Sequence, residues 1–373
     1  MPGEKDAAPV AAGVGQGAAG AAGADPFAPL ELGRRGGTGS ARLRLRNRFV
    51  LAPMASARAE TDGSVSERLV DHYAERAAGG YWGLVECGHH FVSEDGCATA
   101  HQVSIASDDD VDGLAREAAA VHEHDTPVFV QISHAGSATS WCLTREQALS
   151  PSGINCPGAK VGHPLPRPMD ADDIARVVEA FGQAARRARL AGFDGVELHA
   201  AHGYLLDQFL SPLTNHRMDA YGGPLENRLR ITLEALDAVR AEAAGMVVSV
   251  RLGGCDYLPG GTTVADACEA AVLLARHGAD MISVSGGMCY YTRRNTLEPG
   301  WFAGVSDPRA AGARRGWART LPVMLAGGIR SVDDARRLMA RGACDLVGIG
   351  RPALNNPRWA RRNLKPPASQ PVR

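Results

Sequence analysis

The sequence predicts a single (β/α)8 barrel, a TIM barrel of the α/β class, and three observations support this prediction. The chain has 373 residues, which is enough for one large barrel domain. Eight short apolar runs are rich in Val, Leu and Ile without clean alternation, as is typical of parallel strands buried on both faces. Helical periodicity fills the intervals between them. A doubly wound sheet is the alternative, but it does not require an eighth strand so close to the C-terminus.

Each expected element has its own signal in the sequence. The strands are expected at 49–53, 82–87, 127–133, 195–199, 246–252, 281–285, 322–326 and 345–350. The clearest helix follows Asp170, a suitable N-cap with Asp173 in the first turn, and Gly192 follows its end. Its apolar residues recur at helical spacing from 174 to 188. Two further helices are expected over 263–277 and 331–341, each followed by a glycine.

Composition and charge exclude several classes of protein. The formal net charge is −1, so no basic field would attract nucleic acid, and no apolar run approaches the roughly 20 residues of a membrane span. Residues 1–24 are mostly Ala and Gly without the apolar core of a signal peptide, so we expect a disordered tail and a cytoplasmic protein. The barrel is expected over 25–360, with a C-terminal tail over 361–373. The eight cysteines show no C-x-x-C spacing, so neither a metal site nor a disulfide framework is expected.

Two long loops leave the carboxyl ends of the expected strands. Residues 136–169 follow the third strand, and residues 286–318 follow the sixth. Both are candidates for a pocket wall or a lid, and ordinary surface loops are the alternative. The second loop carries aromatic and basic side chains, namely Tyr290, Tyr291, Arg293, Arg294 and Trp301.

The most informative motif directly follows the strand expected at 195–199. His199, His202 and Tyr204 emerge at its C-terminal end, where barrels place catalytic groups. Two imidazoles three residues apart can bind one carbonyl oxygen or oxyanion, and a phenol two residues further on can donate a proton. The sequence therefore predicts an active site at this end of the barrel.

Taken with other motifs in the same order, this run resembles the old yellow enzyme family of FMN-dependent ene-reductases. It looks closest to the branch of the bacterial xenobiotic reductases and the flavin domain of 2,4-dienoyl-CoA reductase. The resemblance covers residues 47–357, and the run 192–228 is its most specific part. The other motifs are the segments 47–54, 72–77, 131–136, 326–329 and 350–352.

The resemblance implies a site for non-covalently bound FMN. Glycine lets backbone N–H groups approach a phosphate, and arginine can bind it in a bidentate manner. A buried arginine needs an anionic or carbonyl partner, and a glutamine amide can both donate to and accept from a pyrimidine edge. The implied FMN contacts are Gly327, Gly328, Gly350 and Arg351 at the phosphate, Arg251 and Gln131 at the pyrimidine, and Pro53, Met54, Ala55 and Cys87 along the ring.

The resemblance also implies the reaction. NADPH or NADH would deliver hydride to the flavin N5, which would return it to the β-carbon of an activated alkene. His199 and His202 would bind the carbonyl oxygen of the substrate, and Tyr204 would protonate the α-carbon. The alkene itself, the preferred nicotinamide and a possible homo-oligomeric state are not encoded in any motif.

The chain departs from the family pattern at several positions. Ala55 stands where relatives often carry a Cys or Thr that donates to the flavin, so we expect a lowered reduction potential. Ala57 replaces a substrate-contacting tyrosine of some relatives, and Ser137 replaces a common arginine. The four-cysteine cluster of the larger relatives has no counterpart after Arg351, so no iron–sulfur cluster is expected.

Other functions are compatible with the same residues. A flavin-dependent desaturase or isomerase of a carbonyl compound would use the site in reverse, with oxygen reoxidising the flavin. A non-redox, aldolase-like barrel would use the His–His–Tyr set for proton transfers and would be colourless when purified. A non-catalytic flavin-binding module is disfavoured by the intact His199, His202 and Tyr204.

Overall fold

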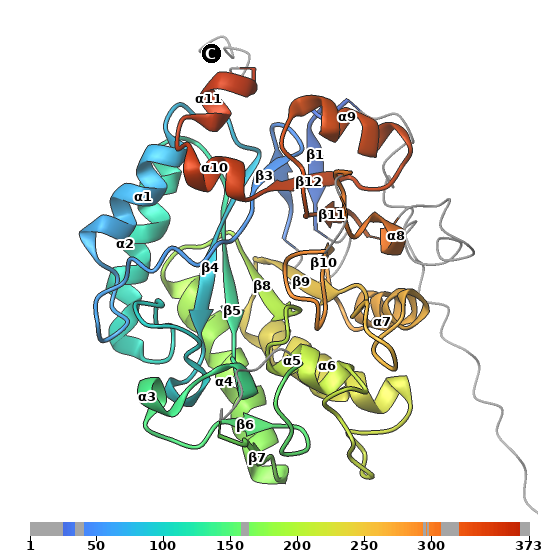
Figure 1. Cartoon of the computed structure of the whole chain (residues 1–373). Helices are drawn as coiled ribbons and strands as arrows, with labels where there is room; N and C mark the ends of the chain where they lie inside the picture. Colours follow the sequence, from blue (N-terminus) through green and yellow to red (C-terminus); the bar gives the residue numbers. More distant parts are fainter. Residues whose placement is uncertain are drawn as a thin grey trace, which may run out of the picture.

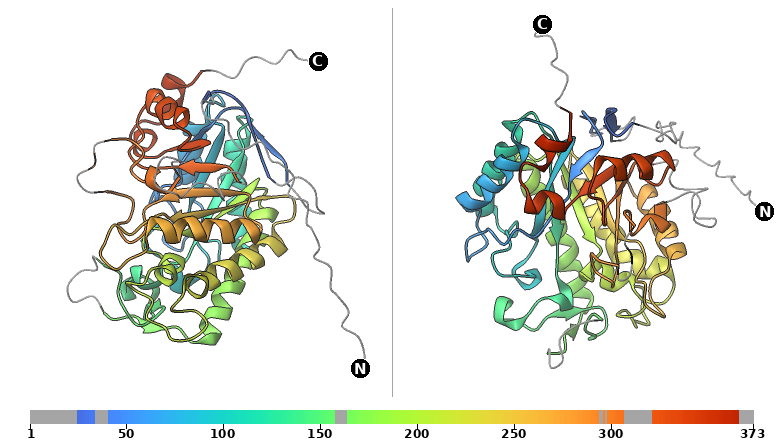
Figure 2. Two further views of the ribbon diagram at one scale, coloured as in Figure 1. Left: turned by 90° about the vertical axis from the view of Figure 1, so that its right-hand side faces the viewer. Right: turned by 45° about the horizontal axis from the view of Figure 1, so that its top comes forward.

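The computed structural model describes residues 25–33, 41–157, 164–293, 296, 298–306 and 321–365, and eight parallel strands form its centre. The strands close into a barrel in the order β10-β11-β12-β3-β4-β5-β8-β9, and every neighbouring pair is parallel. Helices lie outside the strands in all views (Figures 1 and 2). This confirms the predicted (β/α)8 barrel and excludes the doubly wound sheet, which has open edges.

The element bounds agree closely with the sequence prediction. The barrel strands are β3 (Phe49–Leu51), β4 (Leu84–Phe91), β5 (Val128–Ser133), β8 (Gly195–Ala200), β9 (Val247–Gly253), β10 (Met281–Ser285), β11 (Val323–Leu325) and β12 (Leu346–Ile349). The longer helices are α1 (Glu67–Ala77), α2 (Val111–His122), α4 (Ala171–Leu190), α6 (Leu225–Glu242), α7 (Val264–Arg276) and α9 (Val332–Ala340). Short helices are α3 (Trp141–Thr144), α5 (Leu205–Leu210), α8 (Ala303–Ser306), α10 (Arg351–Asn355) and α11 (Trp359–Asn363).

Side-chain caps fix where the predicted helices begin. The Asp170 carboxylate accepts from the backbone N–H of Asp173, and the Asp173 carboxylate accepts from that of Asp170, which satisfies two otherwise free donors. The same reciprocal pattern begins α7 at Thr263 and α9 at Ser331. Each cap lies where a hydroxyl or carboxylate precedes the apolar helical stripe, so the local sequence sets the boundary.

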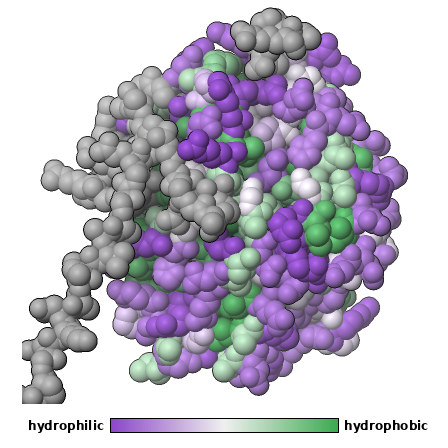
Figure 3. Space-filling view, turned by 180° about the vertical axis from the view of Figure 1, so that it is seen from behind, coloured by the Kyte–Doolittle hydropathy of each residue, from purple (hydrophilic) through white to green (hydrophobic). Residues whose placement is uncertain are grey.

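The expected ends of the chain are tested only in part. Residues 1–24 and Arg294 lie outside the described residues, as do 366–373. Helix α11 runs across the domain boundary predicted at residue 360. Within the described residues, no helix has the length and apolar character to cross a membrane. Hydrophilic residues dominate the face shown in Figure 3, and the hydrophobic ones form small separate groups.

An antiparallel hairpin that the sequence analysis did not predict closes one end of the barrel. Strands β1 (Leu30–Leu32) and β2 (Leu43–Leu45) pair with each other and pack in one apolar cluster with residues that begin the barrel strands. These partners include Leu84, Val247 and Met281, the first residues of β4, β9 and β10. Since the hairpin covers the amino ends of the strands, the carboxyl ends form the open end of the barrel.

The two long loops leave this open end as predicted. The first contains β6 (Leu149–Ser150) and β7 (Arg167–Pro168), which pair with each other. The Tyr290 hydroxyl in the second loop donates to the Pro157 carbonyl in the first at 2.7 Å. The described parts of the loops therefore contact each other beside the strand ends.

We expect Leu45→Ala to lower the free energy of unfolding by about 2–5 kcal/mol, the usual cost of such a cavity in a core. The side chain is fully buried between the hairpin and the barrel. Urea unfolding measures the loss. The control is Leu190→Ala, on a side chain that is 52% exposed, where the change should stay within about 0.5 kcal/mol. If Leu45→Ala lowers the free energy of unfolding by no more than the control does, the hairpin does not support the barrel.

Candidate active site

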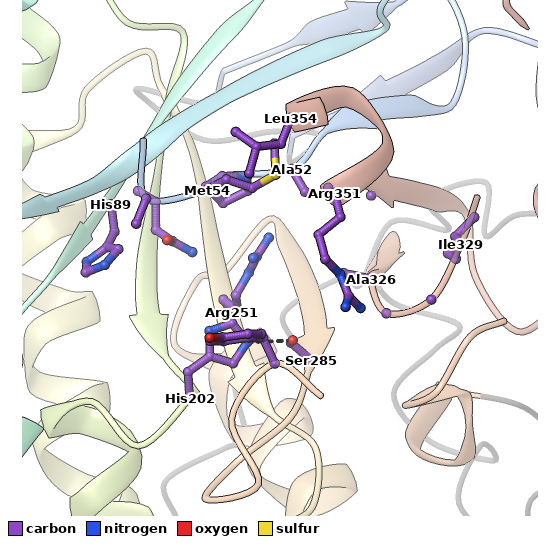
Figure 4. A pocket seen from close by; sticks show the side chains of 18 of the residues that line it. Ala52, Met54, His89, His202, Arg251, Ser285, Ala326, Ile329, Arg351 and Leu354 are labelled. Atoms are coloured by element: carbon purple, nitrogen blue, oxygen red, sulfur yellow. Dashed lines mark hydrogen bonds between the residues drawn. The ribbon is translucent and has the colours of Figure 1, made fainter. Parts of the chain in front are cut away.

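A cavity of about 510 Å³ lies at the carboxyl ends of the strands and collects almost all of the predicted site residues. Figure 4 shows side chains from several strands around this space. A volume of this size suits a cofactor or a drug-sized ligand. The predicted residues that line it are Pro53, Met54, Ala55, Gln131, His199, His202, Tyr204, Arg251, Gly327, Gly328, Gly350 and Arg351.

Cys87 is the predicted site residue that the structure does not bring to the cavity. In β4, Glu86 points into the barrel, where it pairs with Arg251, so the next side chain points outward. Cys87 is fully buried against Tyr73 of α1 and Glu117 of α2. The predicted contact of Cys87 with a cofactor ring has no support in this geometry, and the residue packs between strand and helices.

The turn after β8 presents the His–His–Tyr motif. His199 is the neighbour of Arg251 in the β8–β9 ladder, which places its imidazole inside the rim. His202 adopts a left-handed backbone with φ of +61°, which costs a non-glycine residue free energy and is common at functional sites. Its N–H donates to the Gly286 carbonyl, and the N–H of Gly203 donates to the buried carboxylate of Asp207. These bonds hold the turn in its strained form.

The three side chains of the motif form one compact cluster. The ring centroid of His199 lies 4.8 Å from that of His202 and 4.8 Å from that of Tyr204. His202 Nε2 is 2.7 Å from the Ser285 hydroxyl at the end of β10, the bond drawn in Figure 4. His199 Nδ1 is buried and has no partner among the described residues. A molecule bound in the cavity could therefore form a hydrogen bond with this imidazole nitrogen.

A third imidazole, which the sequence analysis missed, lines the same cavity. His89 Nε2 lies 3.2 Å from the Tyr204 hydroxyl, and the two ring centroids are 4.8 Å apart. It comes from β4, where the pairing with β5 shifts between Cys87 and His90. A bulge of this kind re-aims side chains, and here it turns His89 inward and His90 outward toward Glu117.

Burial keeps the three imidazoles neutral. It lowers the pKa of His89 to about 3, helped by the neighbouring His90 and by Arg251. The pKa values of His199 and His202 also lie well below 6.5, because burial and nearby positive groups disfavour the protonated ring. Burial raises the pKa of Tyr204 to about 12. Among the described residues, no group of three His, Cys, Asp or Glu side chains is arranged to hold a metal ion.

A buried charged layer lies on the inner side of the cavity. Arg251 Nε is 2.9 Å from a Glu197 oxygen and 3.1 Å from the Ser283 hydroxyl, and its Nη2 is 3.3 Å from Glu86. Gln131 donates to the same Glu197 oxygen at 2.8 Å. Burial raises the pKa of Glu86 well above its usual value, with Glu197 adding to the effect. These contacts fix Arg251 and Gln131 as rigid donors in the wall.

At the opposite side, β11 and β12 end in a glycine-lined corner. Gly327 and Gly328 have φ of +112° and +70°, conformations that favour glycine. A Cβ on Gly328 would lie 2.5 Å from Trp301 Nε1, so the indole packs directly on this backbone. That indole N–H is buried without a partner among the described residues. The guanidinium of Arg351 lies 4.9 Å from the Trp301 ring, which adds a positive charge beside these donors.

The second long loop contributes to the wall of the cavity. Tyr291 is 65% exposed, lines the cavity and meets His202 edge-on at 6.0 Å between ring centroids. Arg293 instead lies over the Tyr257 ring at 4.3 Å, and it does not line the cavity. In the described part of this loop, Tyr291 therefore forms part of the pocket wall as expected, whereas Arg293 does not.

Comparisons with known proteins show the family of the chain. The chain matches the model of the NADH:flavin oxidoreductase / NADH oxidase family over residues 27–366. It is 36% identical to an NADPH dehydrogenase of Geobacillus thermodenitrificans over 318 residues, covering 85% of this chain and 89% of that protein. It is 35% identical to an NADH oxidase of Thermoanaerobacter brockii, covering 85% of this chain but 48% of that protein.

The structural comparison points to the same family. The old yellow enzyme homologue of Zymomonas mobilis superposes with a TM-score of 0.76 at 26% identity, covering 93% of this chain and 95% of that one. Fold, residue order and sequence identity thus agree over nearly the whole described chain. The chain belongs to the NADH:flavin oxidoreductase / NADH oxidase family, as its resemblance to the old yellow enzymes predicted.

Proposed function

We propose that this protein is an FMN-dependent ene-reductase that uses NADPH or NADH to reduce an activated alkene. The observation that carries this proposal is the cluster of His199, His202 and Tyr204 at the wall of a cavity whose volume suits a cofactor. Membership of a flavin oxidoreductase family supplies the cofactor class. The cluster supplies the groups that an α,β-unsaturated carbonyl needs.

The residues that line the cavity have the chemistry that FMN requires. The left-handed backbone at Gly327 and Gly328 and the charge of Arg351 suit a phosphate group. Arg251 and Gln131, fixed by Glu197, suit the polar edge of a pyrimidine ring. The methyl group of Ala55 adds no hydrogen bond, which supports the lowered reduction potential expected from the sequence.

When bound, FMN would supply hydride transfer between the nicotinamide and the alkene. His199 and His202 would donate hydrogen bonds to the carbonyl oxygen, which withdraws electrons from the double bond and stabilises the enolate-like transition state. Tyr204 would hold the proton for the α-carbon, and its high pKa keeps the phenol protonated until a basic carbon centre forms. All three groups are neutral at pH 7, so the site is ready to bind an uncharged carbonyl compound.

Anaerobic stopped-flow absorbance near 450 nm tests this proposal on the purified protein. NADPH or NADH should bleach a yellow protein, and 2-cyclohexenone should then restore the colour. In Tyr204→Phe, recolouring should be slowed roughly 100-fold or more, the usual contribution of a positioned acid, with bleaching unchanged. Bleaching without recolouring would favour the desaturase or isomerase alternative, and a colourless protein that binds no FMN would favour the non-redox barrel.

The phosphate contact gives a prediction that does not depend on activity. Arg351→Ala should weaken FMN binding by the deflavinated protein roughly 10- to 100-fold, since a hydrogen bond to a charged group contributes about 1.5–3 kcal/mol. Riboflavin, which lacks the phosphate, should bind both proteins equally. Fluorescence titration measures both ligands, and Arg362→Ala, an exposed arginine outside the cavity, is the matched control. Equal loss of FMN and riboflavin would place Arg351 away from the phosphate.

The pH profile follows from the shifted pKa values of the cluster. The His199 and His202 rings stay neutral far below pH 6.5, and Tyr204 stays protonated up to about pH 12. The rate of flavin reoxidation by the enone should therefore be constant between about pH 6 and about pH 9. Single-turnover rates across this range check it. A titration near pH 6.5 that disappears in His199→Asn would contradict the assigned neutral states.

A further inference from the structure

His89 has a hydrogen-bond arrangement that determines which ring nitrogen carries its proton. Gln102 Oε1 accepts from the backbone N–H of Ala98 at 2.7 Å, so the Gln102 amino group faces His89. That group donates to the His89 carbonyl at 3.1 Å and lies 3.0 Å from His89 Nδ1. An amide NH2 can only donate, so Nδ1 accepts and the single proton of the neutral ring sits on Nε2. The Ser133 hydroxyl lies 2.6 Å from Nδ1, and it can donate to this nitrogen in place of its longer bond of 3.4 Å to the His90 carbonyl.

The proton on Nε2 then determines the direction of the tyrosine proton. His89 Nε2–H donates to the Tyr204 oxygen at 3.2 Å, which uses one lone pair of that oxygen. Among the described residues, the Tyr204 hydroxyl has no second hydrogen-bond partner. Both side chains line the cavity, so the phenolic proton is left for a molecule bound there. The imidazole cannot act as the acid itself, since burial lowers its pKa to about 3.

We propose that His89 is a positioning residue, whose Nε2–H turns the Tyr204 proton toward the substrate and stabilises the tyrosinate that remains after its transfer. This inference rests on the proposed ene-reduction. In the step, the phenolic O–H bond breaks and a C–H bond forms at the α-carbon, while the electron pair of the O–H bond stays on oxygen. The resulting anion accepts the hydrogen bond from His89, and solvent water returns the proton. A donor to an anion in a buried site is worth more than one in water.

The groups packed around His89 are consistent with a neutral, fixed donor. The ring meets His199 of β8 edge-on, with 5.7 Å between ring centroids. The positive charge of Arg251 on β9 and the adjacent His90 both disfavour a charged ring. Gln102 and Ser133 are uncharged partners. No neighbour in this set supplies an anion that would draw a second proton onto the ring, so the donor state is preserved across the working pH range.

The first test reads the tautomer and needs no turnover. In the FMN-loaded protein, ¹⁵N NMR should show His89 with a protonated Nε2 and an unprotonated Nδ1, and the signals should disappear in His89→Gln. Gln102→Leu, which removes the amide donor from the loop beside His89, should weaken this preference. A His89 ring protonated on Nδ1 would overturn the proposal, since Nε2 would then accept from Tyr204 and hold its proton away from the substrate.

The second test is a double-mutant cycle on flavin reoxidation by 2-cyclohexenone. His89→Phe should slow this step roughly 10- to 100-fold and should increase its solvent isotope effect. In a Tyr204→Phe background the same change should have no further effect, because His89 acts through that hydroxyl. His89→Gln, which keeps an N–H donor, should recover part of the rate. The control His277→Gln changes an exposed histidine outside the cavity and should leave the rate unchanged.

The outcomes separate this inference from the proposed function. Full recolouring by the parent and by His89→Phe at equal rates, or additive losses in the double variant, would overturn the role of His89 and leave the ene-reductase proposal intact. A parent protein that never recolours would overturn the ene-reductase proposal and this role with it. The NMR result would then still decide whether His89 is a donor to Tyr204.

Discussion

Closure of the parallel barrel is the constraint on which the other features depend. Because all eight strands run in one direction, their amino ends meet at one end of the barrel and their carboxyl ends at the other. Apolar side chains of the β1–β2 hairpin cover the first end, and the cavity lies at the second. The register of the paired strands then determines which side chains are neighbours. Glu197 lies beside Gln131 and Ser249. Arg251 lies beside His199 and Ser283. Polar residues that are distant in sequence thus form one wall.

Burial in this wall determines the chemistry. One guanidinium, Arg251, lies between the carboxyl groups of Glu86 and Glu197, and its positive charge lowers the pKa of His199 and His202. The histidines therefore stay neutral, and a neutral imidazole can donate a hydrogen bond without requiring a counter-ion. The phenol of Tyr204 stays protonated because burial raises its pKa, and the neighbouring Tyr291 and Tyr290 add to the effect. Under the proposed function, such a site would polarise a carbonyl by fixed donors and would release a proton only to a basic carbon.

Most of the fold and much of the site were predictable from the sequence, because apolar runs and helix caps are local signals. The same holds for the cluster at His199, whose members follow one strand directly. His89 was missed because β4 carries a bulge that reverses the usual alternation after Cys87, and no local pattern reveals it. Up to Cys87 the strand alternates regularly, so the Cys87 side chain lies on the outer face of the barrel. The resemblance had instead implied a contact between Cys87 and the flavin ring. Trp301 was named as a loop residue, but its approach to Gly328 depends on tertiary packing.

A crystal structure of the protein with FMN and bound 2-cyclohexenone would test the central claim most directly. The account predicts that the phosphate lies between Arg351 and the backbone of Gly327 and Gly328. It also predicts that the carbonyl oxygen lies within hydrogen-bond distance of His199 and His202, with the α-carbon facing the Tyr204 hydroxyl. A flavin bound elsewhere, or a carbonyl oxygen that contacts neither imidazole, would contradict the account.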